Sequence, residues 1–377
     1  MTETRTQANE DRTVFRSWFL LILVTIIVLG LGFVAMSMLG ESIDEGASDP
    51  DVFQATDVFM QPDAEWNTSI LVSKSPETRE IRRLSWLVVL IAIGIFVVVE
   101  VLLIFAMIRY RKKSGEEGEP VQMYGSNPIE LAWTVIPILI VVALCLTTVR
   151  TIQSIQPTVT ERPDNALDVE VIGHRWWWEF RIPEYDVVTA NEVSVPVGRP
   201  IWLILDSADV IHSFWVPELQ GKMDAIPAKT NYWRFTADET GTYLGQCAEY
   251  CGTQHANMLI RVDVLEEDAF RAWAVEQGQP PADIEDERVI AGRETFLQFA
   301  CRNCHGIAGV SEGTYAPDLT HLMSRTLIAG GMLPNNENNL KAWLEDPQKI
   351  KPGCDMPALQ LSTSQIEDVV AYLMTLD

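Results

Sequence analysis

Basic side chains are scarce in this chain. Its 377 residues include 28 Lys and Arg against 52 Asp and Glu, so the formal net charge is −24. Nucleic-acid binding needs a basic surface, and this balance argues against it. The acidity suits high solubility, a cationic soluble partner, or a salt-adapted organism in which most proteins are acidic.

Cysteine is also rare, and its six copies do not form the pattern of a disulfide framework. Four of them belong to two short motifs, at 247–251 and 301–304. Cys145 lies in an apolar run and Cys354 near the end of the chain, and we expect both to be small buried residues without chemistry. The length of the chain allows two or three compact units.

Three long apolar runs occupy the N-terminal part of the chain, at 17–40, 84–108 and 129–149. A membrane-spanning helix needs about 20 apolar residues, and each run is long enough. A basic cluster at 109–113 follows the second run, which predicts a cytoplasmic loop there and places the chain beyond Arg150 outside. The first run is either a retained anchor or an export signal that is removed.

From about 166 to 265 the pattern changes to short stretches of alternating apolar and polar residues. Such alternation predicts β-strands. We expect these strands at 168–172, 201–205, 232–235 and 258–264. Several short strands punctuated by Pro and Gly indicate a β-sandwich or barrel.

The loop before the last of these strands carries four metal-binding side chains, Cys247, Cys251, His255 and Met258. Thiolate, imidazole and thioether are soft ligands that favour copper. One Cys, one His and one Met would hold a single copper ion, whereas the second cysteine can bridge a second metal. His212, at an upstream strand end, can supply a second imidazole. A disulfide or a zinc site would use the same cysteines, but zinc sites rarely include Met.

These segments resemble subunit II of the haem-copper cytochrome c oxidases over roughly 79–264, including the helix start at 128–137 and the aromatic stretch at 173–178. The resemblance implies a cupredoxin fold that carries the binuclear copper centre CuA. It further implies that the two coppers are bound by His212, Cys247, Cys251, His255, Met258 and the backbone carbonyl of Glu249.

Three further roles are implied by the same resemblance. The carboxylate of Glu249 reaches a magnesium site shared with subunit I. Trp176 is the point of electron input to CuA, and Glu130 lies at the mouth of a proton channel into subunit I. The alternatives are packing roles for the neighbouring Trp177 and Trp178 and a simple helix-start position for Glu130.

A haem-attachment motif, Cys301-Arg-Asn-Cys304-His305, lies in the last part of the chain. The two cysteines of such a motif bind haem c covalently, and the histidine becomes an axial ligand. Met356 is the expected sixth ligand, which leaves three alternatives: Met323, Met332 and Met374. A thioether ligand raises the haem potential relative to two imidazoles, which suits delivery of electrons to an oxidase.

Helical spacing predicts two helices around this motif, at 289–299 and 364–376. The acidic segment 266–286 contains two consecutive prolines and is expected to be a linker. The last segment resembles a class I cytochrome c. The chain therefore resembles subunit II of the caa3-type oxidases, in which a cytochrome domain follows the CuA domain.

The expected fold is a multidomain membrane protein. Its parts are an N-terminal apolar segment that forms an anchor or signal (1–40), an external acidic loop (41–83), a two-helix transmembrane hairpin (84–150), an all-β cupredoxin-like CuA domain (151–265), a linker (266–286) and an all-α class I cytochrome c domain (287–377).

The resemblance implies the electron-accepting subunit of cytochrome c oxidase in the bacterial cytoplasmic membrane, with the CuA and haem domains on the periplasmic side. Electrons from a soluble or membrane-bound cytochrome, or from an upstream respiratory complex, would pass through haem c to CuA. They would then reach subunit I, which with other oxidase subunits reduces O2 to water and translocates protons. We find no nucleophile or acid–base pair for substrate chemistry in this chain.

Two alternatives remain open at this point. One is the CuA-bearing subunit of a nitric oxide reductase, which would use the same ligands. The other is a membrane-tethered copper and haem sensor without a catalytic partner. Nitrous oxide reductase is excluded, because its second copper domain is rich in histidine and this chain has only five.

Overall fold

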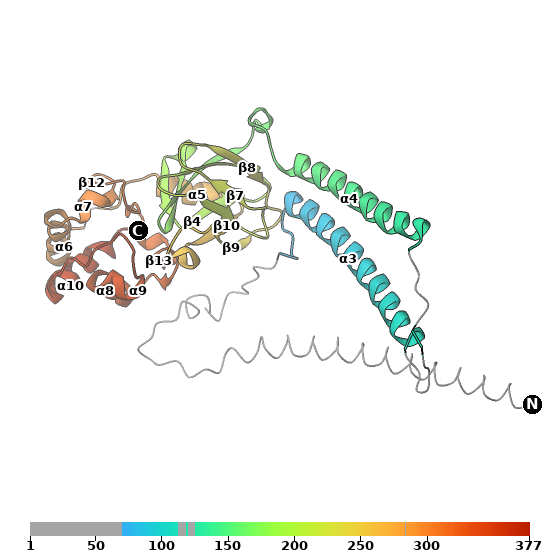
Figure 1. Ribbon diagram of the computed structural model, residues 1–377. Coiled ribbons are helices and arrows are strands. Elements are labelled where there is room, and N and C mark those ends of the chain that lie inside the picture. The colour runs from blue at the N-terminus through green and yellow to red at the C-terminus, as the bar shows by residue number, and fades with distance from the viewer. Residues whose placement is uncertain (1–69, 112–117, 120–124, 283) are drawn as a thin grey trace, which may run out of the picture. The chain divides into compact units, whose positions relative to one another are not determined.

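A computed structural model describes residues 70–111, 118–119, 125–282 and 284–377 (Figure 1). The N-terminal apolar segment 1–40 and most of the predicted loop 41–83 lie outside the described residues. Two long helices, a β-sandwich and a small helical domain make up the described part.

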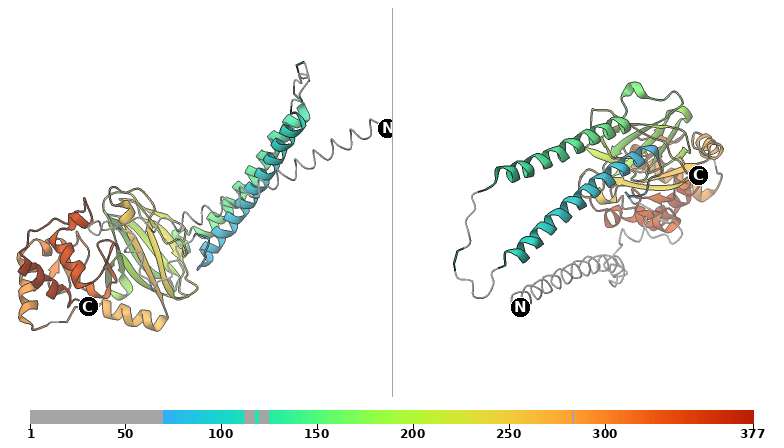
Figure 2. Two further views of the ribbon diagram at one scale, coloured as in Figure 1. Left: turned by 90° about the horizontal axis from the view of Figure 1, so that it is seen from below. Right: turned by 90° about the vertical axis from the view of Figure 1, so that its right-hand side faces the viewer.

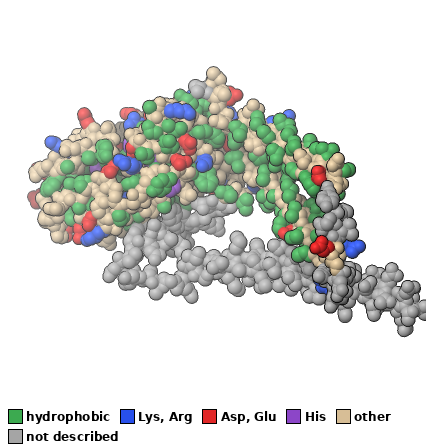
Figure 3. All heavy atoms as spheres, viewed as in Figure 1, with side chains coloured by type: hydrophobic (Ala, Val, Ile, Leu, Met, Phe, Trp, Pro, Cys, Tyr) green, Lys and Arg blue, Asp and Glu red, His purple; other side chains and the backbone are tan. Residues whose placement is uncertain are grey.

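The two long helices are α3 (Pro76–Arg109) and α4 (Asn127–Ile155). Both are long and apolar enough to cross a membrane. Their large apolar side chains are mostly exposed, and Figure 3 shows these side chains covering the visible faces of the helices. Exposure of this kind is costly in water and ordinary in lipid, as expected for membrane spans.

Helix α3 begins at Pro76, inside the segment that we predicted as loop, rather than at 84. Its charged first turns hid the helix from a search for apolar runs. They are helical because Ser75 caps them, its Oγ accepting a hydrogen bond from the amide of Thr78 at 3.0 Å. The hydroxyls of both residues also donate to carbonyls of the β-sandwich, Ser75 to Leu219 at 2.7 Å and Thr78 to Glu218 at 3.1 Å.

The β-sandwich consists of two five-stranded sheets that pack face to face (Figure 2). The first has the order β3-β2-β1-β5-β8, with bounds Val187–Ala190, Trp177–Ile182, Leu167–His174, Ile201–Ser207 and Asn231–Phe235. The second has the order β4-β10-β9-β6-β7, with bounds Glu192–Pro196, Leu259–Leu265, Gly241–Cys247, His212–Trp215 and Met223–Ala225. The pairs β1–β5 and β4–β10 are parallel, so the sandwich is mixed.

The core of the sandwich lies between the sheets and is rich in aromatic side chains. Trp178, Phe180 and Phe214 are each at most 1% exposed, and their rings meet edge to face. All four strands predicted from alternation are present. Strand β2 escaped prediction because its residues are almost all buried and therefore do not alternate.

Helix α5 (Glu267–Gln277) occupies the first half of the segment that we predicted as a linker. Its Phe270 is fully buried against the sandwich and meets Tyr185 edge to face, with ring centroids 5.5 Å apart. The prediction of a linker was therefore wrong for this half, because the acidic surface of the helix concealed its short apolar face.

The C-terminal domain contains helices α6 (Glu287–Gln298), α7 (Cys301–Cys304), α8 (Glu337–Glu345), α9 (Pro347–Ile350) and α10 (Thr363–Leu373). The predicted helices at 289–299 and 364–376 correspond to α6 and α10. These two cross closely at Gly292, where an added Cβ would lie 1.9 Å from the carbonyl oxygen of Asp368. Two short ribbons complete the domain, β11–β12 (Gly306–Ile307 and Ser311–Glu312) and β13–β14 (Leu327–Ile328 and Leu333–Pro334).

Replacing Phe270 by Ala tests whether α5 belongs to the sandwich. Loss of a buried phenylalanine should destabilise the β-sandwich by about 3–5 kcal/mol, because the cavity cannot be refilled. Val275 on the same helix is 58% exposed, and Val275→Ala should change stability by less than about 0.5 kcal/mol. Denaturant unfolding of the full chain, followed by tryptophan fluorescence, measures both; equal midpoints for the two variants would show that α5 is not part of the sandwich.

Candidate metal and haem sites

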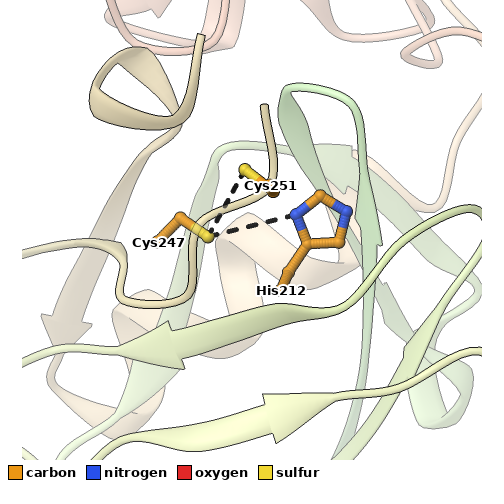
Figure 4. Close-up of side chains that lie close together, drawn as sticks. All are labelled: His212, Cys247 and Cys251. Carbon is orange, nitrogen blue, oxygen red and sulfur yellow. Dashed lines mark hydrogen bonds between the residues drawn. The ribbon is translucent and has the colours of Figure 1, made fainter. Parts of the chain in front are cut away.

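Strand pairing brings the first two candidate metal ligands together. His212 opens β6 and Cys247 closes β9, and these strands pair with Phe214 opposite Cys247. The loop after β9 carries Cys251, and Gly252 directly after it has a φ of +120°, a value that favours glycine. The loop after β9 therefore brings Cys251 back beside Cys247 and His212, at the same end of the sandwich (Figure 4).

The two cysteine sulfurs lie 3.8 Å apart in the interior of the protein. The Cys247 sulfur is 4.0 Å from Nδ1 of His212, and the Cys251 sulfur is 3.6 Å from Nδ1 of His255. Each thiol therefore has its own imidazole. The ligand atoms of His212, Cys247 and Cys251 all lie within 4.8 Å of one another, as a metal site requires (Figure 4).

Two further ligand candidates complete the cluster. Met258 is fully buried, and its sulfur lies 3.9 Å from that of Cys251. The backbone carbonyl oxygen of Glu249 lies 3.2 Å from the sulfur of Cys247. The structure thus gathers all six predicted copper-site residues in one place, and their soft sulfur and nitrogen donors fit copper.

The buried thiols and the neighbouring histidine have shifted pKa values. The pairing of the two sulfurs lowers the pKa of Cys247 and raises that of Cys251. Cys247 is therefore the thiol that loses its proton first. Burial opposes a charge on His212, but its contacts with Asp209 and Cys247 outweigh burial and raise its pKa. A bound cation would displace the remaining protons, because thiolate and neutral imidazole are the ligand forms.

Asp209 is a further candidate site residue, which the sequence did not reveal. Its carboxylate accepts a hydrogen bond from Nε2 of His212 at 2.8 Å, which leaves Nδ1 free to face the sulfurs. It also accepts the backbone amide of Arg175 at 2.7 Å. An acid three residues before a ligand histidine was the available signal, but the spacing alone does not reveal the direction of the side chain.

Trp176 packs directly against the ligand loop. Its indole nitrogen donates to the carbonyl oxygen of Cys251 at 3.0 Å, and the side chain is buried. A Cβ on Gly252 would lie 2.9 Å from the indole ring, so the loop can approach the ring only with glycine at this position. The role of Trp176 as the point of electron input stays a prediction.

The haem-attachment motif faces a largely apolar cavity of about 460 Å³. Cys301, Cys304 and His305 line it, as does Met356. The His305 Nδ1–H donates to the carbonyl of Pro317 at 2.7 Å, which leaves Nε2 available to bind a haem iron. Burial lowers the pKa of His305 and so favours the neutral form that binds iron. These features fit a covalently attached haem.

Met356 lies on the cavity wall, and the described residues place none of the three alternative methionines there. Cys354 also lies on this wall and is only partly buried, while Cys145 on α4 is exposed. The prediction that both cysteines are buried was wrong, because it treated a lone cysteine in an apolar context as a core residue.

Glu130 lies in the first turn of α4, on a different element from the metal and haem residues.

Comparison with known proteins identifies three matching families. The description "Cytochrome C oxidase subunit II, transmembrane domain" matches residues 63–150, the periplasmic domain of the same subunit matches residues 186–265, and "Cytochrome c" matches residues 289–377. A solved periplasmic domain of subunit II of cytochrome oxidase from Bradyrhizobium japonicum is 33% identical, covers 30% of this chain and 95% of that chain, and gives a TM-score of 0.30.

Two relatives resemble the chain over most of its length. Cytochrome c oxidase subunit 2 of Alkalihalophilus pseudofirmus is 35% identical over 326 residues, which is 83% of this chain and 92% of the relative. Cytochrome c oxidase subunit 2 of Bacillus sp. (strain PS3) is 34% identical over 284 residues, which is 71% of this chain and 80% of the relative.

A soft-ligand cluster on a β-sandwich, followed by a haem cavity in the same membrane protein, defines a multi-cofactor electron-transfer subunit. The chain belongs to the cytochrome c oxidase subunit II family. It is a component of cytochrome c oxidase, its domain order fits the caa3 type, and its soluble domains imply copper and haem c. Membership also implies a subunit I partner.

Replacing Asp209 by Asn should weaken copper binding by roughly 10–100-fold, because residues that orient a ligand histidine have effects of this size. Asp206→Asn is the matched control, since the Asp206 carboxylate bonds the neighbouring amide of Ser207 and not a ligand. Competition titration of the metal-free full-length protein with a copper chelator measures both. Unchanged affinity in Asp209→Asn would show that Asp209 does not orient His212.

Proposed function

We propose that this chain accepts electrons at haem c, passes them to a binuclear CuA centre, and delivers them to subunit I for reduction of O2 coupled to proton translocation. The observation that supports this proposal most directly is the pair of cysteine sulfurs 3.8 Å apart, each beside a different histidine. Two thiolates with one imidazole each suit two soft metal ions better than one.

The residues of the two sites have distinct proposed roles. Copper and haem iron supply one-electron chemistry, and the protein supplies fixed ligands and a dry environment. The proposed copper ligands are His212, Cys247, Cys251, His255, Met258 and the carbonyl of Glu249. The proposed haem residues are Cys301, Cys304, His305 and Met356.

Three further roles are part of the proposal. Trp176 receives the electron on its way to CuA, which its contact with the Cys251 carbonyl supports. Glu130, exposed in the first turn of α4, opens a proton channel in subunit I. The Glu249 carboxylate contributes to a magnesium site shared with subunit I, since carboxylate oxygen is a ligand that magnesium prefers.

We propose that the copper and haem domains face the periplasm, because the basic cluster after α3 favours a cytoplasmic loop. The donor is then a soluble or membrane-bound cytochrome or an upstream respiratory complex. The acidic chain would attract a cationic donor. Neither a nitric oxide reductase subunit nor a free-standing sensor is favoured by the family matches.

Metal and spectral analysis of the purified full chain tests the copper assignment. We expect two coppers that share one unpaired electron, together with one covalent haem. Cys247→Ser and Cys251→Ser should each abolish the shared-electron signal, because a hydroxyl is a poor substitute for a bridging thiolate. Cys145→Ser makes the same exchange on α4 and should retain both coppers. A single copper, or zinc, in the unaltered protein would refute CuA.

Replacing Met356 by Ala tests the sixth haem ligand. The haem should stay covalently attached, while its midpoint potential falls on the order of 0.1 V, a fraction of the ~0.8 V that axial ligands span. Met332→Ala and Met323→Ala serve as controls because these methionines are not on the cavity wall. A redox titration measures the midpoint potential of each variant. An unaltered potential in Met356→Ala, together with a lowered potential in Met332→Ala or Met323→Ala, would show that Met356 is not the sixth ligand.

A further inference from the structure

Lys351 is a buried cation at the boundary between the haem domain and the β-sandwich. Its side chain is in the haem domain, directly after α9, and the residue is 3% exposed. Its ammonium donates to three backbone carbonyls, those of Trp176 at 2.7 Å, Ala329 at 2.9 Å and Asn257 at 3.1 Å. Trp176 and Asn257 belong to the sandwich, so this one group joins the two domains.

Three acceptors match the three N–H bonds of an ammonium group. The partners are neutral carbonyls rather than a carboxylate, and burial lowers the pKa of Lys351 to about 7. Such a group is expensive to bury, so its arrangement depends on all three acceptors staying in place. An apolar side chain at this position would leave three buried carbonyls without a donor.

A glycine pair beside Lys351 allows the two domains to approach closely. The amide of Leu259 in β10 donates to the carbonyl of Gly330 at 3.2 Å. An added Cβ on Gly330 would lie 2.2 Å from the Lys351 nitrogen and 2.8 Å from the Trp176 oxygen, and one on Gly331 would lie 2.8 Å from the Cβ of Leu259. The backbone of the haem domain therefore touches the sandwich where a side chain cannot fit.

A second buried charged residue, this one in the sandwich, accepts hydrogen bonds from the haem domain. Glu192 of β4 is 7% exposed, and its carboxylate accepts the amide of Leu327 at 2.6 Å and both the amide and the hydroxyl of Thr326 at 3.0 and 2.8 Å. The sandwich supplies the charge and the haem domain the donors, the opposite of the arrangement at Lys351. Burial raises the pKa of Glu192 against the effect of these hydrogen bonds.

These contacts surround the metal and haem sites rather than lying at a distance. Asn257 immediately precedes the ligand Met258, and Gln254 in the ligand loop donates to the carbonyl of Pro352 at 2.7 Å. The sandwich also forms part of the haem cavity wall, through the segment 174–177. Trp176 thus touches the Cys251 carbonyl on one side and lines the haem cavity on the other.

We propose that Lys351 is a positioning residue that holds the haem domain in one fixed arrangement on the copper domain, so that electron transfer between the two sites needs no domain movement. Glu192 and the turn at Gly330 act in the same contact. This inference rests on the proposed function for its electron-transfer part, while the fixed contact itself stands independently of which metals are bound.

Lys351→Met in the full-length, cofactor-loaded chain tests the proposal. The backbone amides of Leu259, Thr326 and Leu327 donate across the domain boundary, so their hydrogen exchange reports the contact directly. We expect exchange at these amides to accelerate about tenfold or more, because unsatisfied buried carbonyls favour opening. Transfer from flash-reduced haem to copper should slow by a similar factor, with copper content unchanged.

Lys349→Met is the matched control, since Lys349 is exposed two residues earlier and should behave like the unaltered chain. If Lys351→Met does not fold, Gly330→Ala replaces it as the test. This variant disturbs the same contact and should also give faster hydrogen exchange and slower electron transfer. Unaltered exchange and unaltered transfer in the variants that fold would overturn the proposal. Absence of copper from the unaltered chain would instead refute the proposed function. The hydrogen-exchange measurement would still show whether Lys351 holds the two domains together.

Discussion

The close approach of two cysteine sulfurs is the constraint on which the rest of the site depends. Two thiols 3.8 Å apart in a buried environment require strand β9 to end beside β6 and the loop after β9 to return Cys251 beside Cys247. Gly252, directly after Cys251, lets this loop pack against Trp176, because a Cβ there would lie 2.9 Å from the indole ring. The sandwich thus holds the ligand loop 247–258 in one conformation.

The haem domain adds a second constraint of the same kind. Its cavity is closed partly by the segment 174–177 of the sandwich, which also contacts the copper ligand loop through Trp176. Buried charges at Lys351 and Glu192 are poor general stabilisers, because each is costly to remove from water. They are specific, however, since each is satisfied only when the two domains meet in one way. Specific contact suits electron transfer, which depends on a constant separation between sites.

The sequence predicted features that are local in the chain. Cys247 to Met258 and Cys301 to His305 carry their chemistry in their spacing, so the ligand candidates could be identified before any fold was known. The strands with a clear alternation were also predicted correctly, and so was the overall fold class.

Features that depend on packing between distant segments could not be predicted in this way. Strand β2 is buried on both faces, and α5 hides a single aromatic anchor, Phe270, behind acidic residues. Asp209 and Lys351 look like ordinary surface charges in the sequence. Their roles depend on the direction of a side chain and on contacts with other segments, as in the bond from Lys351 to the carbonyl of Trp176, 175 residues away.

The most direct test of this account is the oxidation of haem c by O2 in the assembled oxidase, followed by rapid mixing. In a double variant, Cys247→Ser with Cys251→Ser, we expect haem c to stay reduced on the time scale on which the unaltered complex oxidises it, because the copper relay is missing. Oxidation of haem c at the unaltered rate in that variant would contradict the account.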